Sequence, residues 1–115
     1  MLYTLRILMA EGEPMAKDLY FAELYEQYKN LLNPHRRQLV YEYYILDLSL
    51  GEIAENGGST RQSVNDGLKK ARAQLLELES ALHAAEKYAR LSAFGEKLKE
   101  ENSPFYEEFS QLLKD

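Results

Sequence analysis

Apolar side chains recur at intervals of three and four residues along most of this chain, and this spacing constrains the fold more than any other feature. A period near 3.6 residues places such side chains on one face of an amphipathic helix. No segment shows the alternation of polar and apolar residues that is typical of a half-buried strand. The sequence therefore predicts an all-α protein, a small helical bundle with a helical arm toward its C-terminal end.

The chain of 115 residues fits one domain, because a single hydrophobic core typically organises about 100 to 150 residues. We expect this domain to cover residues 16–115, since a strong helical pattern begins after Met15 and residues 1–15 do not share it. They form either a flexible extension or, for residues 1–14, a segment that precedes a true start at Met15. The apolar run from Leu2 to Met9 contains Arg6 and is shorter than the ~20 residues that cross a bilayer, so no membrane span is predicted.

Two helices are predicted in the first half of the chain. The first runs from about Ala16 to Leu32, and its apolar face consists of Leu19, Tyr20, Leu24, Tyr28, Leu31 and Leu32. Asn33 is a good N-cap and Pro34 suits the first helical position, so a second helix begins there and ends near Leu46. The side chains that this second helix turns inward are predicted to be Leu39, Val40, Tyr43 and Tyr44.

Residues 49–73 carry the signature of a helix-turn-helix, in which two helices are joined by a tight turn that contains glycine. Ser49 and Glu52 have the spacing of a capping box, and a short helix follows to about residue 55. The run Asn56-Gly57-Gly58 can adopt positive φ angles and turn the chain sharply. After the turn, either Ser59 or Thr60 is predicted to cap the next helix.

The helix after the turn is predicted to be long. Its buried stripe begins with Val64, Leu68, Ala71 and Leu75 and continues through Leu78, Leu82 and Ala85. The helix should therefore extend beyond the helix-turn-helix as an arm for packing or dimerisation. Breaks are expected at Gly95 and at Ser103-Pro104, with a last helix from about Pro104 to Leu113. The apolar surface exceeds what one small bundle needs, which predicts a homodimer.

The net charge of −5 is unfavourable for a nucleic-acid binder, so its distribution matters. Residues 1–59 and 73–115 each carry a net charge of −4, whereas residues 60–72 carry +3. The one concentrated positive segment therefore coincides with the start of the helix after the turn. Such a run is also compatible with an ordinary solvated helix face.

Polar residues at the start of this helix are suited to nucleic-acid contacts. At ~100° per residue, Gln62 and Asn65 lie opposite the buried stripe, and Asp66 beside them would repel phosphates. Arg61 suits guanine, while Gln62 and Asn65 suit adenine. The candidate phosphate contacts are Lys69, Lys70, Arg72, Arg36 and Arg37, together with the amides of the helix N-terminus at Ser59 and Thr60.

Other chemistries find little support in the sequence. Cysteine is absent, and the two histidines, His35 and His83, lack the spacing to glutamate or cysteine that forms a zinc site. The segment 57–60 lacks the lysine of a phosphate-binding loop, and no nucleophile has an evident base. Glu52 and Glu55 could share a metal, although solvated carboxylates are far commoner. The sequence thus predicts no enzyme, no cofactor and no metal.

Nine tyrosines in a chain without tryptophan could stack on the bases of single-stranded RNA. Several of them, however, sit at the helical spacing of core residues. We therefore expect the tyrosines to fill the core or a dimer interface rather than to bind RNA bases.

The chain resembles the YlxM-like proteins of Gram-positive bacteria, whose helix-turn-helix is similar to region 4 of sigma factors. The resemblance runs from about Tyr20 to Leu91. This chain departs from the family at Gly57 and Ser59, where the family usually has bulkier apolar side chains. The motifs that carry it are Leu31-Leu32-Asn33-Pro34, Tyr41-Glu42-Tyr43-Tyr44, Leu48-Ser49-Leu50-Gly51-Glu52-Ile53-Ala54-Glu55 and Thr60-Arg61-Gln62-Ser63-Val64. The resemblance implies a small cytosolic protein, encoded beside signal recognition particle genes, that takes part in or regulates that pathway.

Two functions follow as hypotheses. In the first, the chain is a cytoplasmic regulator that binds DNA through its helix-turn-helix. In the second, the helix-turn-helix is only a scaffold, and the acidic helices bind the protein or RNA of the signal recognition particle. A continuous basic surface from Lys69 to Arg36 and Arg37 favours the first. The residues whose negative charge would interrupt that surface are Glu52, Glu55 and Asp66.

Overall fold

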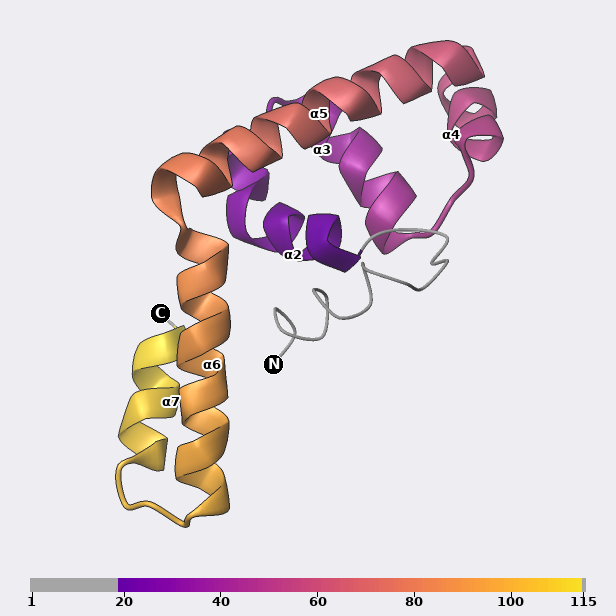
Figure 1. The fold of residues 1–115 in the computed structure, drawn as a ribbon. Helices are drawn as coiled ribbons and strands as arrows, with labels where there is room; N and C mark the ends of the chain where they lie inside the picture. Colours follow the sequence, from indigo (N-terminus) through magenta and orange to yellow (C-terminus); the bar gives the residue numbers. More distant parts are fainter. Residues whose placement is uncertain (1–18, 115) are drawn as a thin grey trace, which may run out of the picture.

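The computed structural model describes residues 19–114, and all of its regular elements over that range are helical (Figure 1). This confirms the all-α class. The predicted N-terminal extension lies outside the described residues. None of the described helices is both long and apolar enough to span a membrane. The elements in chain order are α2 (Leu19–Tyr28), the 3-10 turn η1 (Lys29–Leu31), α3 (Pro34–Val40), the π-helical η2 (Tyr41–Ile45), α4 (Leu50–Gly57), α5 (Arg61–Leu82), α6 (Ala84–Glu100) and α7 (Tyr106–Lys114).

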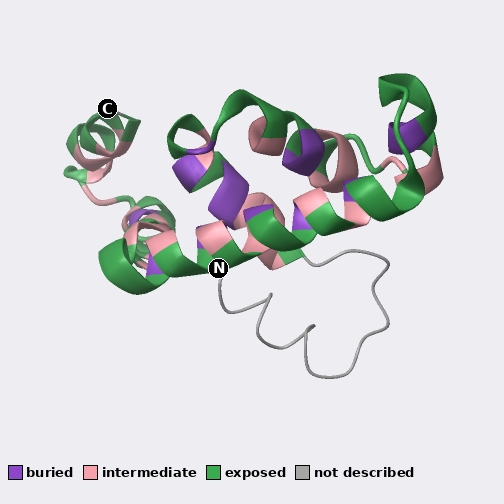
Figure 2. Cartoon of the chain, turned by 90° about the horizontal axis from the view of Figure 1, so that it is seen from above, coloured by how far each residue is buried: buried purple, intermediate pink, exposed green. Residues whose placement is uncertain are grey.

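Helix α5 is the long element against which α2, α3 and α4 pack (Figure 1). Figure 2 shows buried residues repeating along α5 where it faces these helices, with exposed residues on its other side. The first part of the predicted stripe is confirmed, because Leu68, Ala71 and Leu75 are fully buried and Val64 is nearly so. Its continuation through Leu82 was wrong, since that side chain is 53% exposed. The core partners contributed by the other elements are Leu24, Tyr25, Tyr28, Leu32, Leu39, Val40, Ile53 and Ala54.

Three helix starts form as their sequences predict. The Asn33 side chain accepts a hydrogen bond of 2.8 Å from the Arg36 amide, and Pro34 takes the first helical position. Ser49 and Glu52 make both hydrogen bonds of a capping box. Thr60 Oγ1 accepts from the Ser63 amide at 3.0 Å, so of the two residues proposed to cap α5 it is Thr60 that does so.

The first helix ends earlier than predicted. The α-helix stops at Tyr28 instead of Leu32, and the chain tightens into a 3-10 turn. Arg37 from α3 stabilises this ending, since its Nε donates to the Lys29 carbonyl at 3.0 Å and its Nη2 to the Leu32 carbonyl at 3.1 Å. The carbonyls that a helix end leaves without partners are thus bound by a side chain from the next helix.

The prediction of one helix continuing to Ala85 was wrong. Helix α5 ends at Leu82, and His83 adopts a left-handed conformation with φ of 53° before α6 begins. Non-glycine residues adopt this conformation only when their surroundings enforce it. We call this junction, with His83 at its centre, the elbow.

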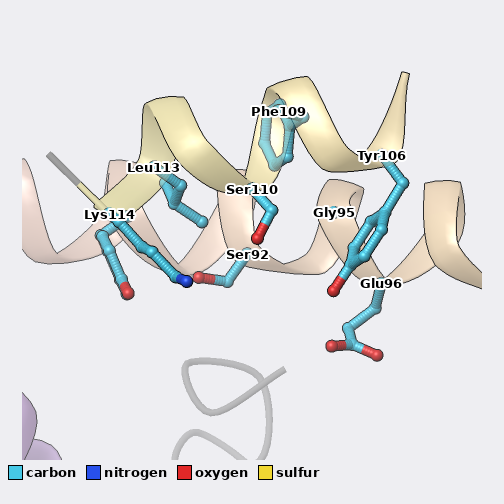
Figure 3. Close-up of a pocket in the computed structure, with 9 residues that line it drawn as sticks. Ser92, Gly95, Glu96, Tyr106, Phe109, Ser110, Leu113 and Lys114 are labelled. Atoms are coloured by element: carbon cyan, nitrogen blue, oxygen red, sulfur yellow. The ribbon is translucent and has the colours of Figure 1, made fainter. Parts of the chain in front are cut away.

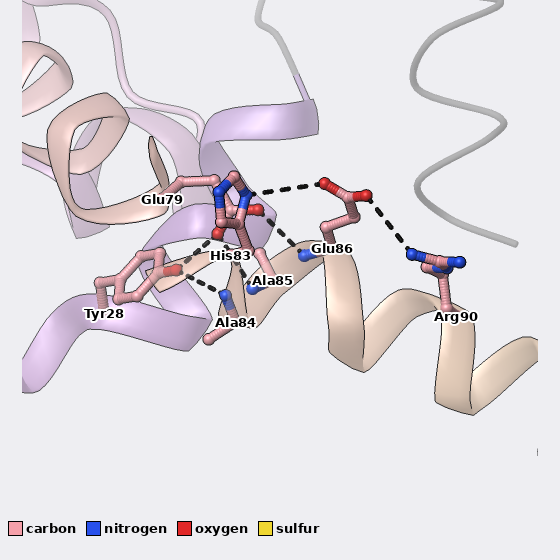
Figure 4. A network of polar contacts seen from close by, with 7 residues as sticks. All are labelled: Tyr28, Glu79, His83, Ala84, Ala85, Glu86 and Arg90. Carbon is pink, nitrogen blue, oxygen red and sulfur yellow. Dashed lines mark hydrogen bonds and ion pairs between the residues drawn. The ribbon is translucent and has the colours of Figure 1, made fainter. Parts of the chain in front are cut away.

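A buried polar network holds the elbow (Figure 4). The carboxylate of Glu79, which is only 7% exposed, accepts hydrogen bonds from the Tyr28 hydroxyl and from the amides of Ala85 and Glu86, both at 3.0 Å. The Tyr28 hydroxyl in turn accepts from the Ala84 amide at 3.0 Å. The first three amides of α6 therefore have partners, although the His83 side chain does not cap the helix.

Gly95 does not break the helix as predicted, because it lies buried inside α6. A Cβ at this position would lie 2.9 Å from Cε2 of Phe109, so glycine lets α7 approach closely. The break predicted at Ser103-Pro104 is confirmed, since the chain is non-helical between α6 and α7. The α6–α7 pair forms a hairpin that projects from the bundle (Figure 1).

Candidate nucleic-acid interface

The start of α5 is presented by a short turn after α4. Helix α4 ends at Gly58, whose φ of 66° places it in the left-handed region. The amide of Ser59 donates to the Ala54 carbonyl at 2.9 Å, which closes the turn. Ile53 and Ala54 are buried, so α4 is fixed against the bundle by its apolar side. The first turn of α5 is thereby held in one orientation.

The residues predicted to contact bases lie on the first turns of α5. Arg61 and Gln62 are exposed, and Asn65 is partly buried. Arg61 lies alongside the first turn of α4, because a Cβ at Gly51 would be 3.7 Å from its Nε. The arginine therefore spans the gap between the two helices of the motif, at the edge of the α5 surface that carries Gln62.

The predicted phosphate contacts fall into two groups. Lys69 and Lys70 are exposed on α5. Arg36, Arg37 and Arg72 are partly buried and engaged within the chain. Arg36 Nη1 donates to Gln74 Oε1 at 2.7 Å, and Arg72 Nη1 donates to the Tyr44 hydroxyl at 3.2 Å. With Arg37 bound to backbone carbonyls, these guanidinium groups link α3 and η2 to their neighbours and do not extend the exposed cationic surface.

The proposed anion site at the helix N-terminus is also partly occupied. The Ser59 amide is bound within the turn, and the Thr60 hydroxyl serves as the cap of α5. What the structure brings together is therefore a short surface at the start of α5, exposed except for the partly buried Asn65. We call it the α5 surface, and its residues are Arg61, Gln62, Asn65, Lys69 and Lys70.

Acidic side chains border the α5 surface. Asp66 is exposed within it, and Glu55 is exposed on α4. Glu52 is also exposed, and one of its oxygens accepts the Ser49 amide at 2.9 Å, so this carboxylate serves the start of α4. The cationic surface is consequently interrupted rather than continuous, which reduces its attraction for a polyanion.

The elbow contains a group that sequence reasoning missed. Ligand atoms of Glu79, His83 and Glu86 lie within 4.8 Å of one another. Their spacing of four and then three residues is the signal that could have revealed the cluster in the sequence. Both oxygens of Glu79 already accept hydrogen bonds, so its carboxylate serves the α6 N-terminus. Burial, together with the hydrogen bond to Glu79, raises the pKa of Tyr28 above its usual value of 10.0.

A shallow groove of about 230 Å³ lies between α6 and α7, away from the α5 surface (Figure 3). Its polar side chains come from both helices, with Ser92 and Glu96 on α6 and Ser110 and Lys114 on α7. None of the residues predicted to bind nucleic acid lines this groove. It therefore adds nothing to the candidate interface.

Comparison with known proteins gives consistent matches. Residues 15–115 match the family model described as "Putative helix-turn-helix protein, YlxM / p13 like". The chain is 37% identical to the UPF0122 protein GK1195 of Geobacillus kaustophilus over 86 residues, which cover 75% of this chain and 78% of the relative. It is 35% identical to the UPF0122 protein GWCH70_1086 of a Geobacillus species over 99 residues, covering 86% and 90% of the two chains.

Proposed function

The chain belongs to the UPF0122 family of helix-turn-helix proteins, and on that premise we propose that it is a non-enzymatic regulatory protein that binds DNA through the α5 surface. In helix-turn-helix proteins the second helix enters the major groove with its N-terminal residues toward the bases. Helix α5 occupies that second position. The observation that carries the proposal is the exposure of Arg61, Gln62, Lys69 and Lys70 on the first turns of α5.

Each residue of the α5 surface has a distinct proposed role. Gln62 and Asn65 suit the edge of adenine, and Arg61 suits guanine. Lys69 and Lys70 lie one to two turns further along and would contact phosphates, which position the protein without reading sequence. Asp66 would oppose the phosphates, so we expect modest affinity that depends strongly on salt.

We also propose a cytoplasmic role in the signal recognition particle pathway, with the chain acting as a homodimer. The support for the pathway is membership of this family, because the resemblance to YlxM-like proteins implies a role in the signal recognition particle pathway. The support for the dimer is the apolar surface that the helical hairpin leaves exposed, together with the paired half-sites that helix-turn-helix proteins commonly bind.

One observation favours a second candidate function. Arg36, Arg37 and Arg72 are engaged within the chain, and acidic side chains border the α5 surface. A short, interrupted cationic surface suits a protein partner better than a long polyanion. In this alternative, the chain binds the protein of the signal recognition particle or a limited segment of its RNA.

Binding titrations with labelled probes separate these functions. The probes are a random-sequence DNA duplex, signal recognition particle RNA and the purified signal recognition particle protein, each titrated at several salt concentrations. If DNA is the partner, Lys69→Ala and Lys70→Ala each reduce the slope of log affinity against log salt by about one. Lys97→Ala, an exposed lysine on α6, is the matched control and should leave the slope unchanged.

The opposite outcome is equally defined. If neither lysine variant changes DNA affinity and the protein probe still binds, the DNA hypothesis fails and the interaction hypothesis stands. Binding to the RNA probe alone, with the same loss in the lysine variants, would assign the α5 surface to RNA.

A further inference from the structure

The α6–α7 hairpin stands apart from the rest of the molecule (Figure 1). The molecule measures 54 × 31 × 25 Å, and its radius of gyration is 16.6 Å. A compact domain of this size has a radius of gyration of roughly 13 Å. The difference reflects the projecting hairpin, in which α7 packs on α6 and lies away from the bundle.

The hairpin has almost no core of its own. Gly95 is the only buried residue of α6, and none of the described residues of α7 is buried. Helix α7 is only 9 residues long, and isolated helices shorter than ~12 residues are marginal in water. Two helices that bury so little need a further surface to cover them.

Six apolar side chains of the hairpin, four exposed and two partly buried, lie in two stripes that meet. Leu91, Phe94 and Leu98 follow each other on α6 at intervals of three and four. Phe109 and Leu112 do the same on α7, and Phe105 precedes them in the turn just before that helix. The two stripes join where the Phe94 and Phe109 rings meet edge to face, with centroids 5.5 Å apart. We call these six residues the hairpin face.

Much of the hairpin face is open to solvent. Leu91 is 45% exposed, Phe94 50%, Phe105 65% and Leu112 71%. The groove in Figure 3 is different, because Ser92 and Glu96 of α6 line it and Leu91 and Phe94 do not, although Phe109 borders both. A contiguous apolar surface of this kind marks an interaction site.

Charges at the two ends of the hairpin are opposite in sign. Among the described residues, the end next to the elbow carries Lys87, Arg90 and Lys114 against Glu86, while the loop end carries Glu100, Glu101, Glu107 and Glu108 against Lys97 and Lys99. Helical spacing places Lys87 at the start of the α6 stripe, four residues before Leu91. Glu101 lies at the loop end of the same stripe, three residues after Leu98. The hairpin face is thus flanked by a cation at one end and an anion at the other.

We propose that the hairpin face is the contact between two copies of this chain, which pair antiparallel into a four-helix bundle. In that arrangement the elbow end of one hairpin meets the loop end of the other, so opposite charges face each other twice. A two-fold axis relates the two contacts, as in most homodimers. The inference rests on the homodimer of the proposed function and identifies its surface, while nucleic-acid binding by the α5 surface is independent of it.

Sedimentation equilibrium across micromolar concentrations tests the proposal. The wild-type chain should sediment at twice the 13.3 kDa of one copy. Leu112→Glu and Leu91→Glu should each weaken self-association at least tenfold. Their matched control is Leu31→Glu, because Leu31 is 55% exposed on η1 and lies outside the hairpin. Circular dichroism should show the same helix content in all three variants, since the changed side chains are exposed in one copy.

A charge exchange tests the antiparallel arrangement. Lys87→Glu alone and Glu101→Lys alone should each weaken the dimer, and the double variant should recover most of the wild-type association. A monomeric wild-type chain would overturn the proposal and leave the face for a different protein. A dimer that the leucine variants do not weaken would keep the homodimer but overturn this surface, and a double variant without recovery would overturn the antiparallel pairing.

Discussion

Replacing Glu79 by alanine should destabilise the protein far more than its position near the end of a helix suggests. The change removes a buried carboxylate that accepts three hydrogen bonds, from the Tyr28 hydroxyl and from the amides of Ala85 and Glu86. Hydrogen bonds to charged groups contribute about 1.5 to 3 kcal/mol each, but the two amides are only partly buried and can reach water after the change. We therefore expect a loss of about 2 to 4 kcal/mol in the free energy of unfolding.

The measurement is urea denaturation followed by circular dichroism at neutral pH, with Glu77→Ala as the matched control. Glu77 is exposed on the same helix, and surface substitutions of this kind usually change stability by less than about 0.5 kcal/mol. If Glu79→Ala lost no more stability than Glu77→Ala, the account of the elbow as a buried cap of α6 would be refuted.

Three further predictions use the same assays. Thr60→Ala should cost about 1 kcal/mol because it removes the cap of α5, whereas Ser59→Ala should cost almost nothing; equal losses would contradict the cap assignment. Because the pKa of Tyr28 is raised above 10.0 in the folded chain, the unfolded chain loses this proton first, and the free energy of unfolding should fall as pH rises through 10.0. Tyr28→Phe should remove that part of the fall, and an unchanged pH profile in this variant would contradict the raised pKa. Leu75→Ala should cost about 2 to 5 kcal/mol and Leu76→Ala, whose side chain is 45% exposed, much less; the reverse order would contradict the stripe.

The caps and the buried stripe of α5 could be predicted from the sequence because their causes are local. Asn33 bonds an amide three residues away, and so does Thr60. The stripe at Leu68 and Leu75 follows from helical spacing alone. Local rules of this kind need no knowledge of the rest of the fold.

The elbow could not be predicted because its cause is long-range. The apolar spacing continues through Leu82 without a break, and a histidine alone does not predict a left-handed conformation, although histidine adopts it more often than most residues. The partner that makes the turn favourable, Tyr28, lies 51 residues before Glu79 in the sequence. Gly95 shows the same limitation, since a glycine that permits close packing on Phe109 cannot be distinguished by sequence from one that ends a helix.

At the candidate site, the charges counted in the sequence do not predict which cationic side chains are available to bind phosphates. Sequence places Arg36, Arg37 and Arg72 among the cations available to phosphates. In the fold their guanidinium groups bind an amide oxygen, backbone carbonyls and a tyrosine hydroxyl. A positive charge in the sequence therefore becomes part of a binding surface only if no internal acceptor lies within reach.

The most direct test of the central claim is the sign of the effect of Asp66→Asn on the affinity for a random-sequence DNA duplex. The substitution removes the negative charge within the α5 surface and keeps the shape of the side chain. If that surface meets phosphates, affinity at low salt should rise by about 1 kcal/mol, roughly fivefold, while Glu77→Gln further along α5 should change nothing. An affinity that falls or stays the same in Asp66→Asn would contradict the claim that α5 binds nucleic acid.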